Sequence, residues 1–177
     1  MRGYIATNER LRPTCPVSGR WGHQPARRLY PHQLPRPRDP GGEPGRGQRS
    51  ADDRTTIYAM FTDPPLAHVG LYEADARRLV AQGRRISQAV HAMKDVSRAK
   101  EESETIGTIK LLIDEDSGLF LGATMLGIQA DEIIQAISLV MASGGTWRAV
   151  RNALPAHPTV TEFLPTILDR RKPLAAG

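Results

Sequence analysis

Proline placement divides this chain into two unlike parts. Eight of its 14 prolines lie between residues 13 and 44. Proline lacks a backbone donor and cannot occupy a helix interior, and beyond Leu34 the stretch to Gln48 carries no apolar group except proline rings. Such a composition cannot bury enough surface to offset the loss of chain entropy. We therefore expect residues 1–56 to be a disordered Pro/Arg-rich segment and folding to begin at Ile57.

The positive charge is concentrated in the same leading segment. Residues 1–56 hold 11 basic and 5 acidic side chains, a net charge of +6, whereas residues 57–177 hold 13 and 14, a net charge of −1. The overall +5 therefore describes the segment and not the foldable part, and we do not expect a nucleic-acid partner. No apolar run approaches the ~18 residues that cross a bilayer, and no secretory segment is visible, so we expect a cytoplasmic protein with no membrane partner. The one cysteine, Cys15, excludes an internal disulfide.

From residue 57 onward, apolar periodicity, glycine stops and turn residues predict alternating strands and helices. The predicted strands are residues 57–61, 86–93, 108–114 and 119–126, and the predicted helices are residues 72–83, 130–143, 146–154 and 159–168. The first strand is expected to be buried, residues 63–65 to break the chain, residues 100–104 to form a solvated loop and residues 115–118 to form a hairpin turn. This order predicts an α+β fold, an antiparallel sheet covered by helices, over residues 57–172.

His157 is the first candidate for chemistry. It precedes Pro158, which favours extended backbone at a helix entrance, and Glu162 lies one turn into the helix that follows. A carboxylate at that position can hydrogen-bond the imidazole and fix its tautomer, which is how a general base is held by its orienting group. From the spacing alone, a helix-capping histidine beside an exposed glutamate is the commoner outcome.

The other histidines and the glycine-rich stretch indicate no site. His68 and His91 stand singly, without a second ligand at metal spacing, and His23 and His32 lie in the Pro-rich segment. The glycines at 41–45 follow no strand and lack the Gly-Lys-Ser/Thr ending of a phosphate loop. We expect structural or incidental roles for these residues and no metal site.

Two motifs near the ends of the foldable part carry a resemblance. The stretch Tyr58-Ala-Met-Phe-Thr-Asp-Pro-Pro-Leu-Ala-His-Val-Gly-Leu71 precedes a predicted helix, and the later stretch His157-Pro-Thr-Val-Thr-Glu162 fits a His-Pro-Thr-x-x-Glu signature. The stretches Gly118-x-x-x-Gly122-Ala and Gly127-x-x-Ala-Asp-Glu132 fit the elements between them. Residues 57–170 thereby resemble the C-terminal dimerisation domain of the pyridine nucleotide-disulfide oxidoreductases, the family of mercuric reductase and dihydrolipoamide dehydrogenase.

The resemblance implies a part in a larger redox enzyme. In that family NAD(P)H reduces FAD, the flavin reduces a dithiol, and the signature histidine acts as acid and base at the dithiol of the partner subunit while the glutamate orients it. By resemblance, His157 and Glu162 inherit these roles, and the partner is a second copy, giving a homodimer, or a full-length homologue. The family's dithiol, its dinucleotide-binding glycine loops and the C-terminal cysteine pair of mercuric reductases are missing from this sequence. We therefore expect no FAD or NAD(P)H on this chain alone and no turnover.

The leading segment carries a second, weaker resemblance. Residues 1–12 resemble the strand before the family's second flavin motif, but the motif itself does not follow. A shifted reading frame permits Gly-Asp-Ile-Asn-Arg-Arg-Gly-Ala-Phe-Thr-His-Thr-Ser-Tyr over residues 21–34, which looks like that motif and the helix after it. We interpret residues 13–49 as a frame-shifted remnant of a flavin-binding domain, with the frame restored before Thr56.

Two other functions stay open. The chain can be a noncatalytic dimerisation subunit that pairs with a full-length paralogue and lends it His157. The chain can instead be a nucleic-acid-binding module whose basic tail, Arg20 to Arg49, contacts phosphates and shows steeply salt-dependent binding. The charge distribution favours this alternative less than the first.

Overall fold

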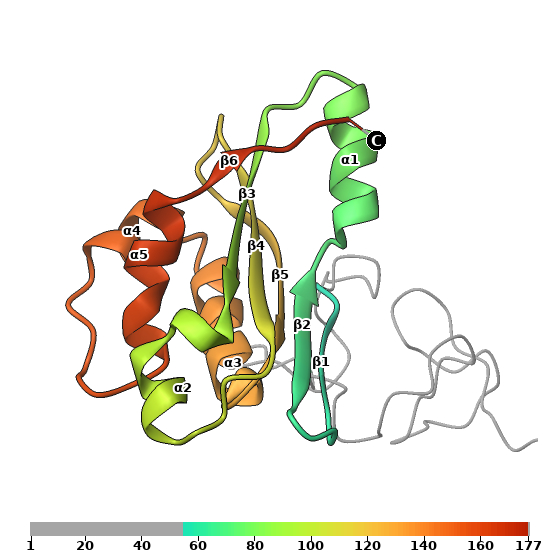
Figure 1. The fold of residues 1–177 in the computed structure, drawn as a ribbon. Helices are drawn as coiled ribbons and strands as arrows, with labels where there is room; N and C mark the ends of the chain where they lie inside the picture. Colours follow the sequence, from blue (N-terminus) through green and yellow to red (C-terminus); the bar gives the residue numbers. More distant parts are fainter. Residues whose placement is uncertain (1–54, 177) are drawn as a thin grey trace, which may run out of the picture. The chain divides into compact units, whose positions relative to one another are not determined.

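The computed structural model describes residues 55–176, which form one antiparallel sheet with helices on both faces (Figure 1). The strand order is β1-β2-β5-β4-β3-β6. The strands are β1 (Ile57–Met60), β2 (Leu66–Gly70), β3 (Ile86–Ala92), β4 (Thr108–Asp114), β5 (Phe120–Leu126) and β6 (Lys172–Pro173). The helices are α1 (Glu73–Ala81), α2 (Ser97–Glu101), α3 (Ala130–Ala142), α4 (Trp147–Asn152) and α5 (Leu164–Asp169), with 3-10 turns η3 (Met93–Asp95) and η4 (Thr161–Phe163). The expectations for residues 1–54, including disorder and the roles of Cys15, His23 and His32, lie outside the described residues.

The predicted fold class, an α+β fold with helices on an antiparallel sheet, is confirmed. The central hairpin joins β4 to β5 through the predicted turn at 115–118, where the Gly118 backbone donates to the Asp114 carbonyl at 2.8 Å. Gly118 has a φ of +75°, a conformation that other residues rarely adopt, which explains the glycine at the end of this turn.

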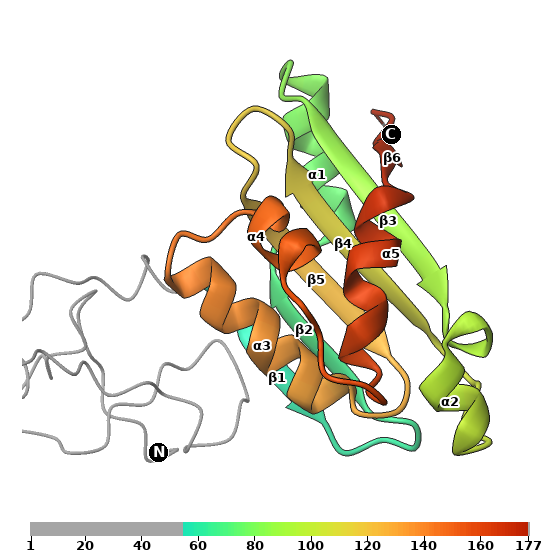
Figure 2. The same ribbon diagram turned by 90° about the vertical axis from the view of Figure 1, so that its left-hand side faces the viewer.

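One face of the sheet forms the main core with α3 and α5 (Figure 2). Alternate strand residues point to this face because side chains in a strand alternate between its two sides. The core residues of the strands are Ala67, Val69, Ala89, Ile109, Leu111, Ile113, Ala123 and Met125, and those of α3 and α5 include Ile133, Ile134, Ile137, Leu164, Ile167 and Leu168.

The opposite face, which we call the outer face, is only partly covered by α1 (Figure 1). Helix α1 contributes Ala76 to a small second core with Ile86, Leu112 and Leu174. The remaining part of the outer face carries side chains of β2, β4 and β5 that no helix of the described residues covers.

Several elements differ from the sequence-based expectations. The short β6 was not predicted, and the predicted helix at 159–168 is η4 followed by α5. Strand β2 was not predicted, yet it lies inside the sheet between β1 and β5. The first strand, expected to be buried, is a half-exposed strand that pairs only with β2 among the described residues. Helix α2 begins three residues before the predicted solvated loop at 100–104, because Ala99 is buried and gives the segment an inward face. None of the helices described in residues 55–176 has the length and apolar character that a bilayer-spanning helix needs.

Candidate functional site

His157 and Glu162 meet at the entrance to η4. The imidazole Nδ1 donates to the Glu162 carboxylate Oε2 at 2.7 Å, so the structure brings the two predicted site residues together. The His157 side chain is 78% exposed, whereas that of Glu162 is 14% exposed. The carboxylate is therefore held against the domain while the ring it orients projects into solvent.

The loop that carries this pair is fixed by its own backbone contacts. The Thr159 hydroxyl donates to the Ala156 carbonyl at 2.8 Å and accepts from the Glu162 backbone amide at 3.1 Å. Val160, 1% exposed, anchors the loop in the main core. Local hydrogen bonds and one buried side chain thus set the direction of the Glu162 carboxylate.

This geometry selects one tautomer of the exposed ring. A carboxylate can only accept, so Nδ1 of His157 carries the proton and Nε2 of the neutral ring presents a lone pair. An imidazole of this kind can take a proton at Nε2 and return it. The pair can therefore act as an acid and base toward a group outside the described residues.

The two other described histidines are buried within the domain. His68 on β2 is fully buried and its ring stacks on Tyr72 at 4.0 Å between centroids. His91 on β3 packs 5.8 Å from the Phe163 ring, with Nδ1 3.5 Å from the Arg170 guanidinium. Within residues 55–176 no group of three metal-ligating side chains comes together.

A charged cluster on the outer face went unnoticed in the sequence. Glu73, at the start of α1, accepts from Lys110 on β4, from Arg77 at 2.7 Å and from Gln88 on β3 at 3.0 Å. The ammonium of Lys110, then the other two donors, lower the pKa of Glu73 to about 2. The sequence separation of 37 residues between Glu73 and Lys110 explains why only the strand register reveals the contact.

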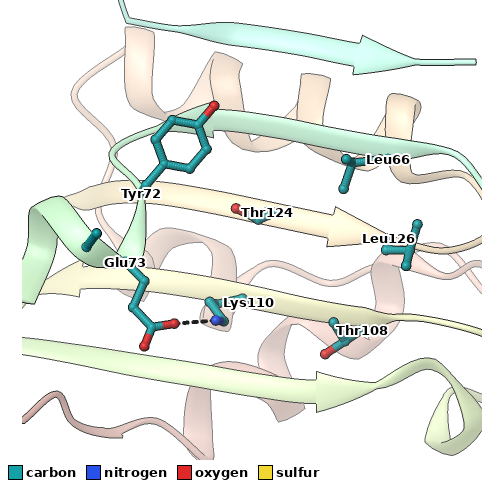
Figure 3. A pocket seen from close by; sticks show the side chains of 8 residues that line it. Leu66, Tyr72, Glu73, Thr108, Lys110, Thr124 and Leu126 are labelled. Carbon is teal, nitrogen blue, oxygen red and sulfur yellow. Dashed lines mark hydrogen bonds and ion pairs between the residues drawn. The ribbon is translucent and has the colours of Figure 1, made fainter.

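Beside this cluster lies an open cavity of about 410 Å³ (Figure 3). Its floor is formed by β2, β5 and β4, and the start of α1 forms one wall. The lining residues are Leu66, Tyr72, Glu73, Ala74, Thr108, Lys110, Thr124 and Leu126. The cavity lies on the outer face, whereas α3, α4 and α5 lie on the other side of the sheet (Figure 2).

A dinucleotide cofactor places its diphosphate at the turn between a strand and the helix that follows. In this domain such turns join β2 to α1 and β5 to α3. A helix that opens onto a diphosphate leaves its first backbone amides free for the anion. At α1, Glu73 and Asp75 occupy the first turn and the Asp75 carboxylate accepts from the Tyr72 amide at 3.3 Å. At α3, Asp131 and Glu132 place two negative charges in the first turn. The acidic side chains at both helix starts disfavour a diphosphate, so neither of these two turns is a dinucleotide-binding turn.

Comparisons with known proteins agree on one family. The profile of the pyridine nucleotide-disulphide oxidoreductase dimerisation domain matches residues 56–167. The chain is 33% identical over 121 residues to the probable pyridine nucleotide-disulfide oxidoreductase RclA of Escherichia coli, covering 68% of this chain and 27% of the relative. It is 37% identical over 114 residues to a dihydrolipoyl dehydrogenase of Synechocystis, covering 64% of this chain and 24% of the relative.

The fold gives the same answer. The structure of the HOCl-induced flavoprotein disulfide reductase RclA from Escherichia coli superposes with a TM-score of 0.65 at 31% identity, covering 71% of this chain and 28% of that one. The chain thus spans about a quarter of the length of the relatives it matches. By sequence profile, identity and fold together, this chain belongs to the pyridine nucleotide-disulphide oxidoreductase family, of which it carries the dimerisation domain.

Proposed function

We propose that the described domain pairs with a second chain and presents His157 and Glu162 to a redox-active dithiol on that chain. The observation that carries this proposal is the exposed imidazole whose Nδ1 donates to Glu162 at 2.7 Å. Residues 55–176 contain no cysteine, so the thiol that this base serves belongs elsewhere. The family match supports a partner subunit as the place.

In this proposal the histidine handles protons and no electrons. Nε2 of His157 takes the proton from an attacking thiol, which leaves the thiolate that reacts with a disulfide. The imidazolium then returns the proton to the thiolate that leaves. Glu162 acts through the ring by holding the Nδ1 proton and stabilising the imidazolium, so Glu162 is a positioning residue. In an intact enzyme of the family, FAD and NAD(P)H supply the electrons.

Exposed leucines on the helical side of the domain favour this side as the pairing surface. Leu139 on α3 is 63% exposed and Leu154, between α4 and His157, is 97% exposed. Association becomes more favourable when a partner covers large apolar side chains and removes them from water. A partner seated on α3 would also lie beside the segment that leads to His157.

A chimaeric enzyme tests the proposal. Residues 56–176 replace the matching part of the Synechocystis dihydrolipoyl dehydrogenase, and the dehydrogenase activity of the chimaera is measured. Because general acid–base catalysis contributes about 100-fold or more, His157→Gln should lower kcat by at least that factor. Glu162→Gln should lower kcat less, since it disturbs only the orientation of the ring.

Flavin absorbance and sedimentation of each chimaera separate the two halves of the proposal. A colourless or monomeric chimaera would show that the domain cannot take the place of its relative in pairing. A yellow dimer whose His157→Gln variant keeps the full rate would contradict the acid–base role and leave the pairing role intact.

We also propose that residues 13–49 derive from a flavin-binding domain read in a shifted frame, and that the chain is a fragment of such an enzyme. The start of the family match at residue 56, where the frame is inferred to be restored, supports this origin. Resequencing the gene and its upstream DNA tests it. Single-base corrections near codons 13 and 49 should restore the flavin motif, and codons that do not permit the shifted peptide would contradict it.

A further inference from the structure

The cavity on the outer face has a floor whose hydrogen-bonding character can be worked out atom by atom. His68 lies beneath it, fully buried, with both ring nitrogens engaged. Nε2 is 3.0 Å from the Gly70 carbonyl, which can only accept, so Nε2 carries the proton. Burial lowers the pKa of His68, which favours the neutral ring, and Nδ1 is then an acceptor.

The state of His68 decides what Thr124 offers to the cavity. The Thr124 hydroxyl lies 2.8 Å from Nδ1 and must donate its proton there. Its oxygen therefore faces the cavity with lone pairs only. Thr124 lines the cavity and lies on β5 opposite Lys110 of β4, at the centre of the view in Figure 3.

Thr108 repeats this arrangement on the neighbouring strand. Its hydroxyl donates to the His91 carbonyl at 3.0 Å, so its proton is also committed away from the cavity. Two hydroxyl oxygens on adjacent strands thus offer acceptors and no donors. The ammonium of Lys110 beside them is held in an ion pair with the Glu73 carboxylate at the edge of the cavity.

Apart from Glu73, the walls above this floor are apolar. The Tyr72 ring is held by the stacked His68 ring, at 4.0 Å and 4° between planes, and by a 3.0 Å hydrogen bond between its hydroxyl and that of Tyr58. Leu66 and Leu126, paired across β2 and β5, close the opposite end (Figure 3). A volume of about 410 Å³ is in the range that small-molecule sites occupy.

We propose that this cavity binds a small, neutral, planar aromatic molecule that carries a ring N–H donor. The ring would lie against Tyr72, Leu66 and Leu126, and its N–H would donate to the hydroxyl oxygen of Thr124 or Thr108. The site lies on the opposite face of the sheet from α3 and α5 and needs no residue of a partner (Figure 2). It is therefore independent of the pairing surface and of His157.

Two isosteric probes test the chemistry on the full chain. Indole carries the N–H, whereas benzofuran has the same size and shape with an oxygen acceptor in that place. Titration of the 15N-labelled protein should give saturable amide shifts confined to β2, β4, β5 and the start of α1. Indole should bind about fivefold more tightly than benzofuran, the ratio expected for one neutral hydrogen bond.

Three variants locate the contacts. Tyr72→Leu should weaken indole binding about fivefold through loss of the aromatic wall, without touching the hydrogen bonds of His68. Thr124→Ser should keep the preference for indole, and Thr124→Val should reduce it. If Thr124→Val does not fold, the probe pair on the wild-type protein and on Tyr72→Leu still decides the question. Equal affinity for the two probes, unsaturable shifts, or unchanged indole binding by a folded Tyr72→Leu variant would overturn the proposal.

Discussion

Glu73 shows how one carboxylate can join elements that are distant in sequence. It stands at the start of α1 and contacts Lys110 of β4 and Gln88 of β3, so it fixes the helix on the outer face of the sheet. With a pKa of about 2, it stays ionised at any ordinary pH. Its side chain is 27% exposed, so solvent screening keeps the net contribution to about 1 kcal/mol.

The lowered pKa of Glu73 predicts a defined loss of stability in acid. A carboxyl group whose folded pKa lies below the ordinary 4.5 stabilises the fold above pH 4.5, and this contribution disappears as the pH falls from 4.5 to 2. Glu73→Gln should therefore lower the free energy of unfolding by about 1 kcal/mol at pH 7 and have little effect near pH 2. Urea midpoints measured across this range check the prediction, with the exposed residue Glu104→Gln as the control. An equal destabilisation by Glu73→Gln at both pH values would contradict it.

The pairing of His157 with Glu162 was predictable from the sequence, whereas the charged cluster around Glu73 was not. His157 and Glu162 are only five residues apart, so the loop held by Thr159 can bring them together, and Nδ1 and Oε2 lie 2.7 Å apart. The catalytic roles proposed for them rest on the resemblance to the family signature, because spacing by itself favoured a capping histidine. The contacts of Glu73 with Lys110 and of His68 with Thr124 span 37 and 56 residues. Such contacts depend on strand register, which local patterns do not reveal.

The junction of β2 with α1 explains how a helix can lie so close to the sheet. Leu71 donates its backbone amide to the Leu121 carbonyl at 2.8 Å, which brings the chain directly over β5. A side chain at Gly122 would place its first carbon 2.2 Å from the Leu71 carbonyl oxygen, closer than atoms can approach. Glycine at this position therefore sets the path of α1 and, with it, one wall of the outer cavity.

Substituting Gly122 should cost far more than substituting a glycine in open space. Gly122→Ala should destabilise the domain by about 3 kcal/mol, because two backbone segments must move apart. Gly144→Ala meets no atom within 4 Å and should cost about 1 kcal/mol, the penalty for a side chain at a φ of +68°. Chemical denaturation of both variants measures the difference. Similar losses for the two would show that the close approach at Gly122 is not tight.

Among the elements, most of the periodic segments were predictable, whereas the short β2, α2 and β6 were not. Helix α3 ends within one residue of its predicted end, because Ile133, Ile134 and Ile137 repeat on one face and glycines follow. Strand β2 has only five residues, follows two prolines and carries His68 among its apolar side chains, so its alternation is concealed. Its place inside the sheet comes from pairing with β5, more than fifty residues away. The short β6 depends likewise on its pairing with β3.

Residues 56–167 form a family domain, and the matched part makes up about a quarter of the relatives' length. The main core is complete on one side of the sheet, yet α3 leaves Leu139 exposed and the loop beyond α4 leaves Leu154 exposed. These leucines and the projecting His157 lie on segments of the helical side. A partner there would cover apolar surface and receive the imidazole at the same time.

A charge introduced at the proposed pairing surface should weaken association and leave the fold unchanged. Leu139→Asp and Leu154→Asp should each weaken self-association by about tenfold or more, since a carboxylate loses its hydration when a partner covers it. Far-ultraviolet circular dichroism should stay unchanged, because neither leucine belongs to the core. Gln82→Glu, at an exposed position at the end of α1 on the outer face, adds a charge away from this surface as a matched control. Unaltered association of both leucine variants would place the pairing surface elsewhere.

Sedimentation velocity of the full chain over a wide concentration range tests pairing most directly. We expect a dimer that dissociates on dilution and that Leu139→Asp shifts to the monomer at the same concentration. A wild-type chain that sediments as a monomer at several hundred micromolar would contradict the claim that this domain, in this chain, acts through a partner.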